Sequence, residues 1–292
     1  MSLVATAAVA MLFRFSVDLH RTRLILNDEQ INLASQGATL WAIDTLNTNW
    51  KNKNPNKLTD IIPIHSKTDE VNGIEIESAI YDMQSSFNLN NLATKDSQTS
   101  FLKLLSIVDP ELGQEKATQI SLALQDWISA SDKSQHFDAD YAGQHPPYRA
   151  PHHLMASVTE LRLVNGITPT LYNKLLPFVT ALSANTKINI NNAPAEVICS
   201  LNPSLTLTAA KEIVRERKTT PFVSEQKFLD LDIIKNTNSN YADKITVTSN
   251  FFLLKTMLSS GQQHLILYTL LRRNTKDNKS TLSTLWQTKG TM

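Results

Sequence analysis

Acidic side chains gather in the middle of the sequence, where they could bind a metal ion. Asp126 lies near the end of an apolar helical pattern, and further acids follow in a polar stretch: Asp132, Asp138, Asp140 and Glu160. Hard cations such as calcium take roughly six to eight oxygen ligands, which flexible acidic loops supply well. A solvated acidic loop with a helix cap is the alternative, and the residues leave both interpretations open.

Four histidines fall in the same region, at positions 136, 145, 152 and 153. A zinc site needs three or four ligands placed tetrahedrally, and the side chains of the adjacent His152 and His153 diverge. We therefore interpret these histidines as surface residues. Cys199, the single cysteine, lies on an apolar helical pattern and is interpreted as a core residue.

The sequence shows no motif that would support an enzymatic reaction. We find no Ser-His-Asp arrangement, Gly-x-Ser-x-Gly motif or glycine-rich phosphate loop, and the chain has only 7 glycines. The net charge is +1, so no global field attracts nucleic acid or an anionic membrane. The sequence predicts neither a catalytic site nor a small-molecule substrate.

Two stretches resemble helix-hairpin-helix units, which bind DNA phosphates through backbone amides at a glycine-containing hairpin. They are "ELRLVNGITPTLYNKLLPFV" (160–179) and "NNAPAEVICSLNPSLTLTAAKEIVRER" (191–217). The first keeps only Gly166, with Thr168 where a second glycine is expected, and the hairpin of the second has none. Because glycines let the backbone approach phosphate, we interpret both as structural hairpins and keep DNA binding as the alternative.

The elements that carry these residues begin with a long helix over residues 1–46. Its first thirteen residues, "MSLVATAAVAMLF", carry no charge and would cover about 20 Å, against about 30 Å of bilayer hydrocarbon. We expect them to be the second half of a membrane helix whose start lies upstream of Met1. Candidate residues for packing against other helices are Val4, Ala8, Leu12, Phe15 and Leu19.

The remaining periodicities predict an α+β fold. After a polar loop at 47–60, residues 73–81 alternate as a half-buried strand, residues 97–184 carry helical spacing, and shorter helices follow at 195–201, 207–217 and 225–231. Three strands are expected at 244–258, 263–274 and 280–289. We predict one antiparallel sheet, packed on the amphipathic half of the first helix and interrupted by a helical insertion.

Two asparagine-rich stretches, "FNLNNLATKD" (87–96) and "KININNAPAEV" (187–197), bracket this helical region. Each is expected to be a short strand with its Leu or Ile inward and its Asn side chains outward. Asn192 should cap the following helix, as Asn91 or Thr94 should after the first stretch. We expect Asn88 and Asn90 to lie close to Asn189 and Asn191 and to hold the base of the insertion together.

Six pieces in this order resemble the K-type minor pseudopilin of the bacterial type II secretion system, also called general secretion pathway protein K. They are "FNLNNL", "DWI" with Trp127, "PPYR" with Tyr148, "SVTELRLVNGIT", "ININNAPAEV" and the terminal "SNFFLL…YTLLRR". The resemblance implies a pilin-like body with a SAM-like all-α insertion of helical hairpins. We place the helix at 1–46, the first part of the body at 47–87, the insertion at 88–190 and the remainder at 191–292.

The resemblance also implies a function. Such a protein is anchored in the bacterial inner membrane by a single helix, with its body in the periplasm, and nucleates or caps the pseudopilus at its tip. Its partners would be the I-type and J-type minor pseudopilins, with no nucleic acid. The resemblance also implies a calcium site in the insertion, where the family usually has the sequence Asp-Trp-Ile-Asp. In this chain Ser129 replaces the last Asp.

Overall fold

A single long helix forms the N-terminal part of the computed structural model, which describes residues 2–51, 63–66, 68–71, 73–130, 137–235, 241, 243–260, 263–276 and 279–290. Helix α1 (Ser2–Lys51) has 50 residues and is therefore about 75 Å long. The predicted long helix is confirmed, and it continues past Leu46 into the segment predicted as a loop. Residues 52–60 of that loop lie outside the described residues.

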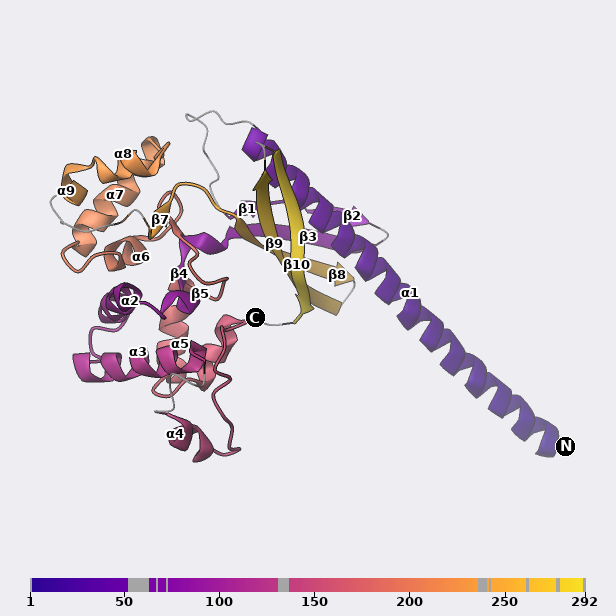
Figure 1. Cartoon of the computed structure of the whole chain (residues 1–292). Helices are drawn as coiled ribbons and strands as arrows, with labels where there is room; N and C mark the ends of the chain where they lie inside the picture. Colours follow the sequence, from indigo (N-terminus) through magenta and orange to yellow (C-terminus); the bar gives the residue numbers. More distant parts are fainter. Residues whose placement is uncertain are drawn as a thin grey trace.

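An antiparallel sheet packs against the C-terminal half of α1 (Figure 1). Its strands follow the order β1-β3-β8-β9-β10, and β2 also pairs with β3. This arrangement confirms the predicted sheet with three C-terminal strands, although the first of them begins at Phe251 and not at residue 244. The bounds are β1 (Ile64–His65), β2 (Asp69–Val71), β3 (Ile74–Asp82), β8 (Phe251–Ser260), β9 (Gln263–Lys276) and β10 (Lys279–Lys289).

The contact between α1 and the sheet is built on small side chains. Ala34, Ala38 and Ala42 recur every four residues, so they form one face of the helix, and each is at most 5% exposed. They pack with Leu46 against isoleucines and leucines of β3, β8 and β9. Because alanine has no side chain beyond Cβ, the helix axis can approach the sheet closely.

A helical block lies on the side of the sheet away from the N-terminus (Figure 1). We use this name for the helices α2 to α9 with the short strands β4 to β7 and three 3-10 turns. Its elements are β4 (Phe87–Asn88), η3 (Leu89–Asn91), α2 (Lys95–Val108), α3 (Gln114–Ile128), α4 (Asp138–Ala142), η4 (Val158–Leu163), α5 (Pro169–Leu175), η5 (Leu176–Phe178), β5 (Val179–Thr180), β6 (Ile188–Asn189), α6 (Ala195–Ser200), α7 (Leu207–Thr219), α8 (Glu225–Leu229), α9 (Asp232–Lys235) and β7 (Ile245–Thr246).

One continuous hydrophobic core fills this block. It extends from Phe87 to Ile245 and includes side chains from both sides of residue 190, such as Leu105, Val197 and Phe228. The predicted border at residue 190 therefore falls inside a single core. The helices after that border belong with the insertion, because their apolar faces are buried against α2 and its neighbours.

The chain enters and leaves the block at adjacent strands. β3 leads in through the 3-10 turn η2 (Met83–Ser85), and β8 leads out; in their antiparallel register Asp82 pairs with Phe252. Within the block, β4 pairs with β5 and β6 pairs with β7, both in parallel. Each pair thus joins segments far apart in the sequence.

Candidate functional site

The N-terminal part of α1 projects beyond the sheet (Figure 1), and several of its apolar side chains are exposed. Val9, Met11 and Phe13 are 66%, 75% and 73% exposed. The side chain of Val4 lies outside the described part of the structure, and the other four residues predicted for helix packing are exposed: Ala8, Leu12, Phe15 and Leu19. An exposed apolar surface of this extent marks an interaction site.

Among the described residues, no helix combines the length and the hydropathy that a membrane span requires.

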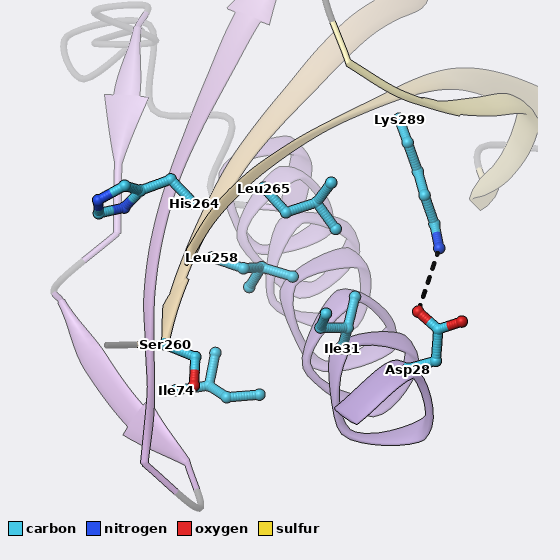
Figure 2. A pocket seen from close by; sticks show the side chains of 8 residues that line it. All are labelled: Asp28, Ile31, Ile74, Leu258, Ser260, His264, Leu265 and Lys289. Atoms are coloured by element: carbon cyan, nitrogen blue, oxygen red, sulfur yellow. Dashed lines mark ion pairs between the residues drawn. The ribbon is translucent and has the colours of Figure 1, made fainter. Parts of the chain in front are cut away.

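A groove marks the point where α1 leaves the sheet (Figure 2). Its volume is about 430 Å³, and Ile31 of α1 and Leu258 of β8 line it. At its rim, Nζ of Lys289 lies 4.0 Å from Oδ1 of Asp28, so an ion pair joins the last strand to the helix. The groove separates the sheet-covered half of α1 from the exposed apolar half.

Asp126 is the most unusual of the acidic residues predicted to bind a cation. It lies in the last turn of α3 and is only 3% exposed. Both of its carboxylate oxygens are buried, and neither has a hydrogen-bond partner among the described residues. Burying a carboxylate without partners is costly, so this position is suited to a positive charge from outside the chain.

His152 connects Asp126 with Asp138. Its Nδ1 lies 3.3 Å from the backbone oxygen of Asp126, and its Nε2 lies 3.3 Å from Oδ1 of Asp138. His153 lies on the surface, as predicted, with its Nδ1 2.8 Å from the Leu154 oxygen. In the described part of the chain, no three His, Cys, Asp or Glu side chains are grouped so as to hold a metal ion.

Glu160 uses both carboxylate oxygens within the protein. Oε1 accepts hydrogen bonds from the backbone of Ala156 at 2.7 Å and of Ser157 at 3.3 Å, which completes a capping box at the start of η4. Oε2 accepts a hydrogen bond from Nε1 of Trp127 at 3.2 Å. This carboxylate therefore links η4 to α3, a structural role.

Asp140 likewise has a partner within the chain. Its Oδ2 accepts a hydrogen bond from Nδ2 of Asn165 at 3.0 Å, which joins α4 to the hairpin before α5. Asp132 lies outside the described residues, as does His136. Of the predicted ligands, Asp126 and Asp138 both contact His152, Asp126 through its backbone oxygen and Asp138 through its carboxylate.

Three aromatic rings pack beside Asp126. Trp127 contacts Tyr141 and Tyr148 edge to face, with ring centroids 5.5 and 6.5 Å apart. Burial raises the pKa of Tyr141 to about 12, and the Tyr148 hydroxyl donates to the Leu163 oxygen at 2.7 Å. The residues Trp127 and Tyr148, named from their motifs, thus belong to one structural cluster.

The first asparagine stretch is buried, contrary to the expectation that its side chains face outward. Asn88 and Asn90 are each 2% exposed. Asn90 exchanges hydrogen bonds with the backbone of Met155, its Oδ1 accepting at 2.8 Å and its Nδ2 donating at 3.0 Å, and also donates to the Leu182 oxygen. Asn88 accepts from the Leu182 amide at 3.0 Å. These side-chain amides pair backbone groups of the loops around the short strands β4 and β5.

The second stretch is arranged in the same way. Asn189 is 3% exposed and donates to Asp82 at 3.0 Å and to Ser249 at 2.8 Å. Asn191 donates to the Phe222 oxygen at 2.9 Å and accepts from the Phe222 amide at 2.9 Å. The outward orientation predicted for this stretch is therefore also wrong for Asn189.

The predicted helix caps are half correct. Thr94 caps α2 by accepting from the Ser97 amide, as one of the two alternatives predicted. Asn192 does not cap α6, which begins after Pro194 without a side-chain cap. The N-cap position is occupied by Pro194, and Asn192 donates to Oδ2 of Asp82 at 2.6 Å.

The first asparagine stretch lies beside the segment that leads into the second, while the proximity of Asn88 and Asn90 to Asn189 and Asn191 stays a prediction. Nδ2 of Asn91 donates to the Thr186 oxygen at 2.8 Å, directly before the second stretch. Asn88, Asn91 and Ile188 also line one cavity of about 650 Å³. The cavity thus lies between the start of the first stretch and the start of the second.

Asp82 holds the junction of the helical block and the sheet together, and sequence reasoning missed it. Its side chain accepts hydrogen bonds from the Gln84 amide, the Ser249 hydroxyl and the amide groups of Asn189 and Asn192. Burial raises its pKa above the ordinary 3.8, and the hydrogen bonds oppose that shift. An acid at the end of an apolar strand, shortly before the first asparagine stretch, was the available signal.

Two buried arginines were also missed. Arg217 donates to the Ile190 oxygen, and burial lowers its pKa to about 10. Arg273 donates to the Leu46 and Ser249 oxygens and lies 4.7 Å from the centre of the Phe252 ring. Arg273 thus ties α1, the sheet and the exit strand together.

The hairpins that resemble helix-hairpin-helix units are held by internal contacts. Gly166 has φ of +85°, and Thr168 caps α5 by accepting from the Leu171 amide. In the second hairpin, Cys199 is buried and its Sγ donates to the Leu205 oxygen at 3.0 Å. The prediction that Cys199 is a core residue is confirmed.

Together, a long helix laid on an antiparallel sheet and a projecting apolar half define a pilin-like protein with a helical insertion. Family models described as "Type II secretion system (T2SS), protein K" match residues 85–184 and 188–248, more than half of the chain. The chain belongs to the type II secretion system protein K family.

Curated relatives agree with this assignment. The type II secretion system protein K of Pectobacterium carotovorum subsp. carotovorum is 30% identical over 65% of this chain and 64% of that protein. That of Klebsiella pneumoniae is 32% identical over 58% and 56%, and that of Pseudomonas aeruginosa is 30% identical over 71% and 63%. The matches thus span less than two thirds of these relatives.

A solved structure shares the fold. The crystal structure of the GspK-GspI-GspJ complex from the enterotoxigenic Escherichia coli type 2 secretion system matches with a TM-score of 0.75 at 22% identity. The match covers 93% of this chain and 100% of that one.

Proposed function

We propose that this chain is a minor pseudopilin at the tip of the type II secretion pseudopilus, where it nucleates or caps the fibre during protein export. The exposed apolar half of α1, projecting from a pilin-like body, carries the proposal. In this role α1 packs with other pseudopilin helices, and the helical block prevents a further subunit from stacking on the tip of the fibre. The role is structural, without catalysis.

The proposed partners are the I-type and J-type minor pseudopilins. The structural neighbour was solved in a complex with GspI and GspJ, and the family assignment supports the same partners for this chain. The proposed location is the bacterial inner membrane, with one anchoring helix and the body in the periplasm.

Removal of residues 2–20 tests this function. We expect a folded body that no longer assembles with the partners and does not support secretion, because the apolar half of α1 is gone. The measurement is export of a secreted enzyme from cells that carry the truncated chain, with the full chain as the control. Unimpaired export would contradict the proposal.

DNA binding remains the alternative role, and a mobility-shift assay separates the two. We expect no salt-dependent shift of DNA at submicromolar protein, because the hairpin glycine contacts the protein itself and the net charge is only +1. A salt-dependent shift would favour the alternative.

We further propose a calcium site at Asp126. The buried carboxylate without a hydrogen-bond partner favours it, with Asp138 close by through His152. Asp126 and Asp138 would hold the ion, and the sequence offers Asp132 as a further ligand. Calcium, when bound, supplies the positive charge that the buried carboxylate lacks.

The melting temperature of the chain with and without calcium tests this site. Calcium at about 100 times its Kd stabilises a folded protein by about 2.7 kcal/mol, so we expect a rise of several degrees. Asp126→Asn should abolish the rise, whereas Glu111→Gln, which changes an exposed acid of the block, should keep it. No rise in the full chain would remove the site.

A further inference from the structure

The cavity of about 650 Å³ beside the first asparagine stretch lies at the start of α2. The first turn of that helix lines it, together with the segments around Lys187 and Lys244. Pockets that bind small molecules usually measure about 300–1,000 Å³, so the space is large enough for an organic ligand. We call it the α2 cavity.

Three lysines line the α2 cavity: Lys95, Lys187 and Lys244. Two acids, Asp96 and Asp243, line it as well, so the lining carries a net charge of +1. Nζ of Lys244 lies 3.4 Å from Oδ2 of Asp96, and this ion pair compensates one of the two acids. The lining is therefore suited to a ligand with a single negative charge.

The N-terminus of α2 adds backbone donors to the same wall. Thr94 caps the helix by accepting from the Ser97 amide, and the Gln98 amide bonds the Thr94 oxygen. The amides of Lys95 and Asp96 come before the first intrahelical bond, so the helix offers them no carbonyl. Because α2 has 14 residues, its dipole also favours an anion at this end.

Ser100 indicates a ligand independently of the helix end. Thr94, Ser97 and Ser100 are spaced by three residues, so they lie on one side of α2, and all three line the cavity. Ser100 is only 3% exposed, and within the described part of the chain its hydroxyl has no hydrogen-bond partner. A buried hydroxyl without a partner is costly, so this donor is suited to an acceptor that enters the cavity.

The rest of the lining includes an apolar wall. Phe87, Ile188 and Leu201 contribute to it, and they are 4%, 6% and 2% exposed. An aliphatic group gains free energy when it leaves water for such a wall, whereas a small hydrated ion leaves the wall unused. A ligand that matches the whole lining thus has one negative charge and an apolar group.

We infer that the α2 cavity binds an apolar monocarboxylate. The ammonium groups of Lys95 and Lys187 pair with the carboxylate at the N-terminus of α2, the Ser100 hydroxyl donates to it, and the aliphatic group packs on the apolar wall. The C-terminal residue of a peptide and a free carboxylic acid share this chemistry. The exposed half of α1 that carries the proposed function has no part in the cavity, so either proposal can fail without the other.

Titration calorimetry of the full chain with N-acetyl-leucine tests the site, because this probe has one carboxylate and one aliphatic side chain. We expect binding that is about tenfold weaker or lost with N-acetyl-leucinamide, which lacks the charge, and about fivefold weaker with N-acetylglycine, which lacks the side chain. Binding of inorganic phosphate without binding of N-acetyl-leucine would overturn the inference, and so would the absence of binding by both.

A short glycine peptide that ends in leucine distinguishes the two sources of the carboxylate. Tighter binding of this peptide than of N-acetyl-leucine would support the C-terminus of a protein as the ligand, and equal binding would support a free acid. The same peptide with an amidated end is the control and should not bind.

Ser100→Ala and Lys187→Gln test whether the probe occupies this cavity. Each should raise the Kd of N-acetyl-leucine about fivefold or more, because each removes a hydrogen bond to a charged group. Ser100→Ala should leave the melting temperature unchanged or raise it, since no described residue bonds the hydroxyl.

Two variants of α3 serve as matched controls for these substitutions. Ser121→Ala changes a serine that is 4% exposed, Lys116→Gln changes an exposed lysine, and neither residue lines the cavity. Both should bind N-acetyl-leucine like the unaltered chain. If Ser100→Ala and Lys187→Gln also bind like the unaltered chain, the probe binds elsewhere and the site is overturned.

Discussion

Gly166 shows how one residue type can indicate two different roles. In the sequence it marks a hairpin like those that bind DNA phosphates. In the structure its φ of +85° suits glycine, and a Cβ at this position would lie 2.8 Å from Cγ1 of Ile120. The close approach is to a side chain of α3. The glycine is thus explained by packing within the block, and a phosphate need not be invoked.

Gly166→Ala should lower the free energy of unfolding by about 2 kcal/mol or more, because it adds both a strained φ and an overlap with Ile120. Chemical denaturation measures the loss. The control is Gly143→Ala, whose Cβ would meet neighbours at an ordinary 3.6 Å and should change stability by about 0.5 kcal/mol or less. In an Ile120→Ala background the Gly166→Ala penalty should shrink. Equal, small effects at both glycines would contradict the packing explanation.

The two asparagine stretches illustrate what sequence can predict about an element. Their position at the base of the block followed from their repeated pattern. Their burial could not be predicted, because the hydrogen-bond partners that compensate for it lie far along the chain. Asn90 bonds Met155, 65 residues away, and Asp82, which bonds Asn189, also bonds Ser249, 167 residues away. Polar residues are ordinarily exposed, and only tertiary contacts reverse that rule.

The periodic elements were predictable for the converse reason. Strand β3 alternates buried and exposed residues along its first half, so its pattern is local to the chain. The pattern of helix α1 is also local, because Ala34, Ala38 and Ala42 are buried at intervals of four residues. The border of the insertion depends instead on which core Val197 and Phe228 join, and the helical spacing of these segments carries no such information.

Asp82 at the end of β3 gives the junction a pH dependence. Its folded pKa is raised by burial, so its contribution to stability is fully present below the ordinary pKa of 3.8 and is lost as pH rises through the folded pKa. Asp82→Asn should remove this part of the dependence. It should also cost about 1–3 kcal/mol at neutral pH, because an amide group then faces the donors of Asn189 and Asn192.

Urea unfolding of both proteins from below pH 3.8 to neutral measures these effects. Asp69→Asn, at an exposed acid of β2, serves as the matched control and should follow the unaltered chain. If Asp82→Asn and the unaltered chain show parallel pH profiles, Asp82 does not titrate as described.

At the scale of the whole molecule, the described residues form two large hydrophobic cores. One lies between α1 and the sheet, and the other fills the helical block. A small cluster of Leu182, Phe251 and Leu270 connects the block to the sheet. Each core buries its own apolar faces, which is why the block could be recognised as an insertion although its border was misplaced.

The adjacency of β3 and β8 has a mechanical consequence. The block is attached to the sheet by two neighbouring strands, with Asp82 opposite Phe252. Two attachment points side by side resist separation, yet alone they resist twisting poorly, since both lie close to one axis. The hydrogen bonds that Asp82 receives from Asn189, Asn192 and Ser249 attach two further segments to the end of β3. We expect these bonds to stiffen the joint against twisting, so that the block and the sheet turn together.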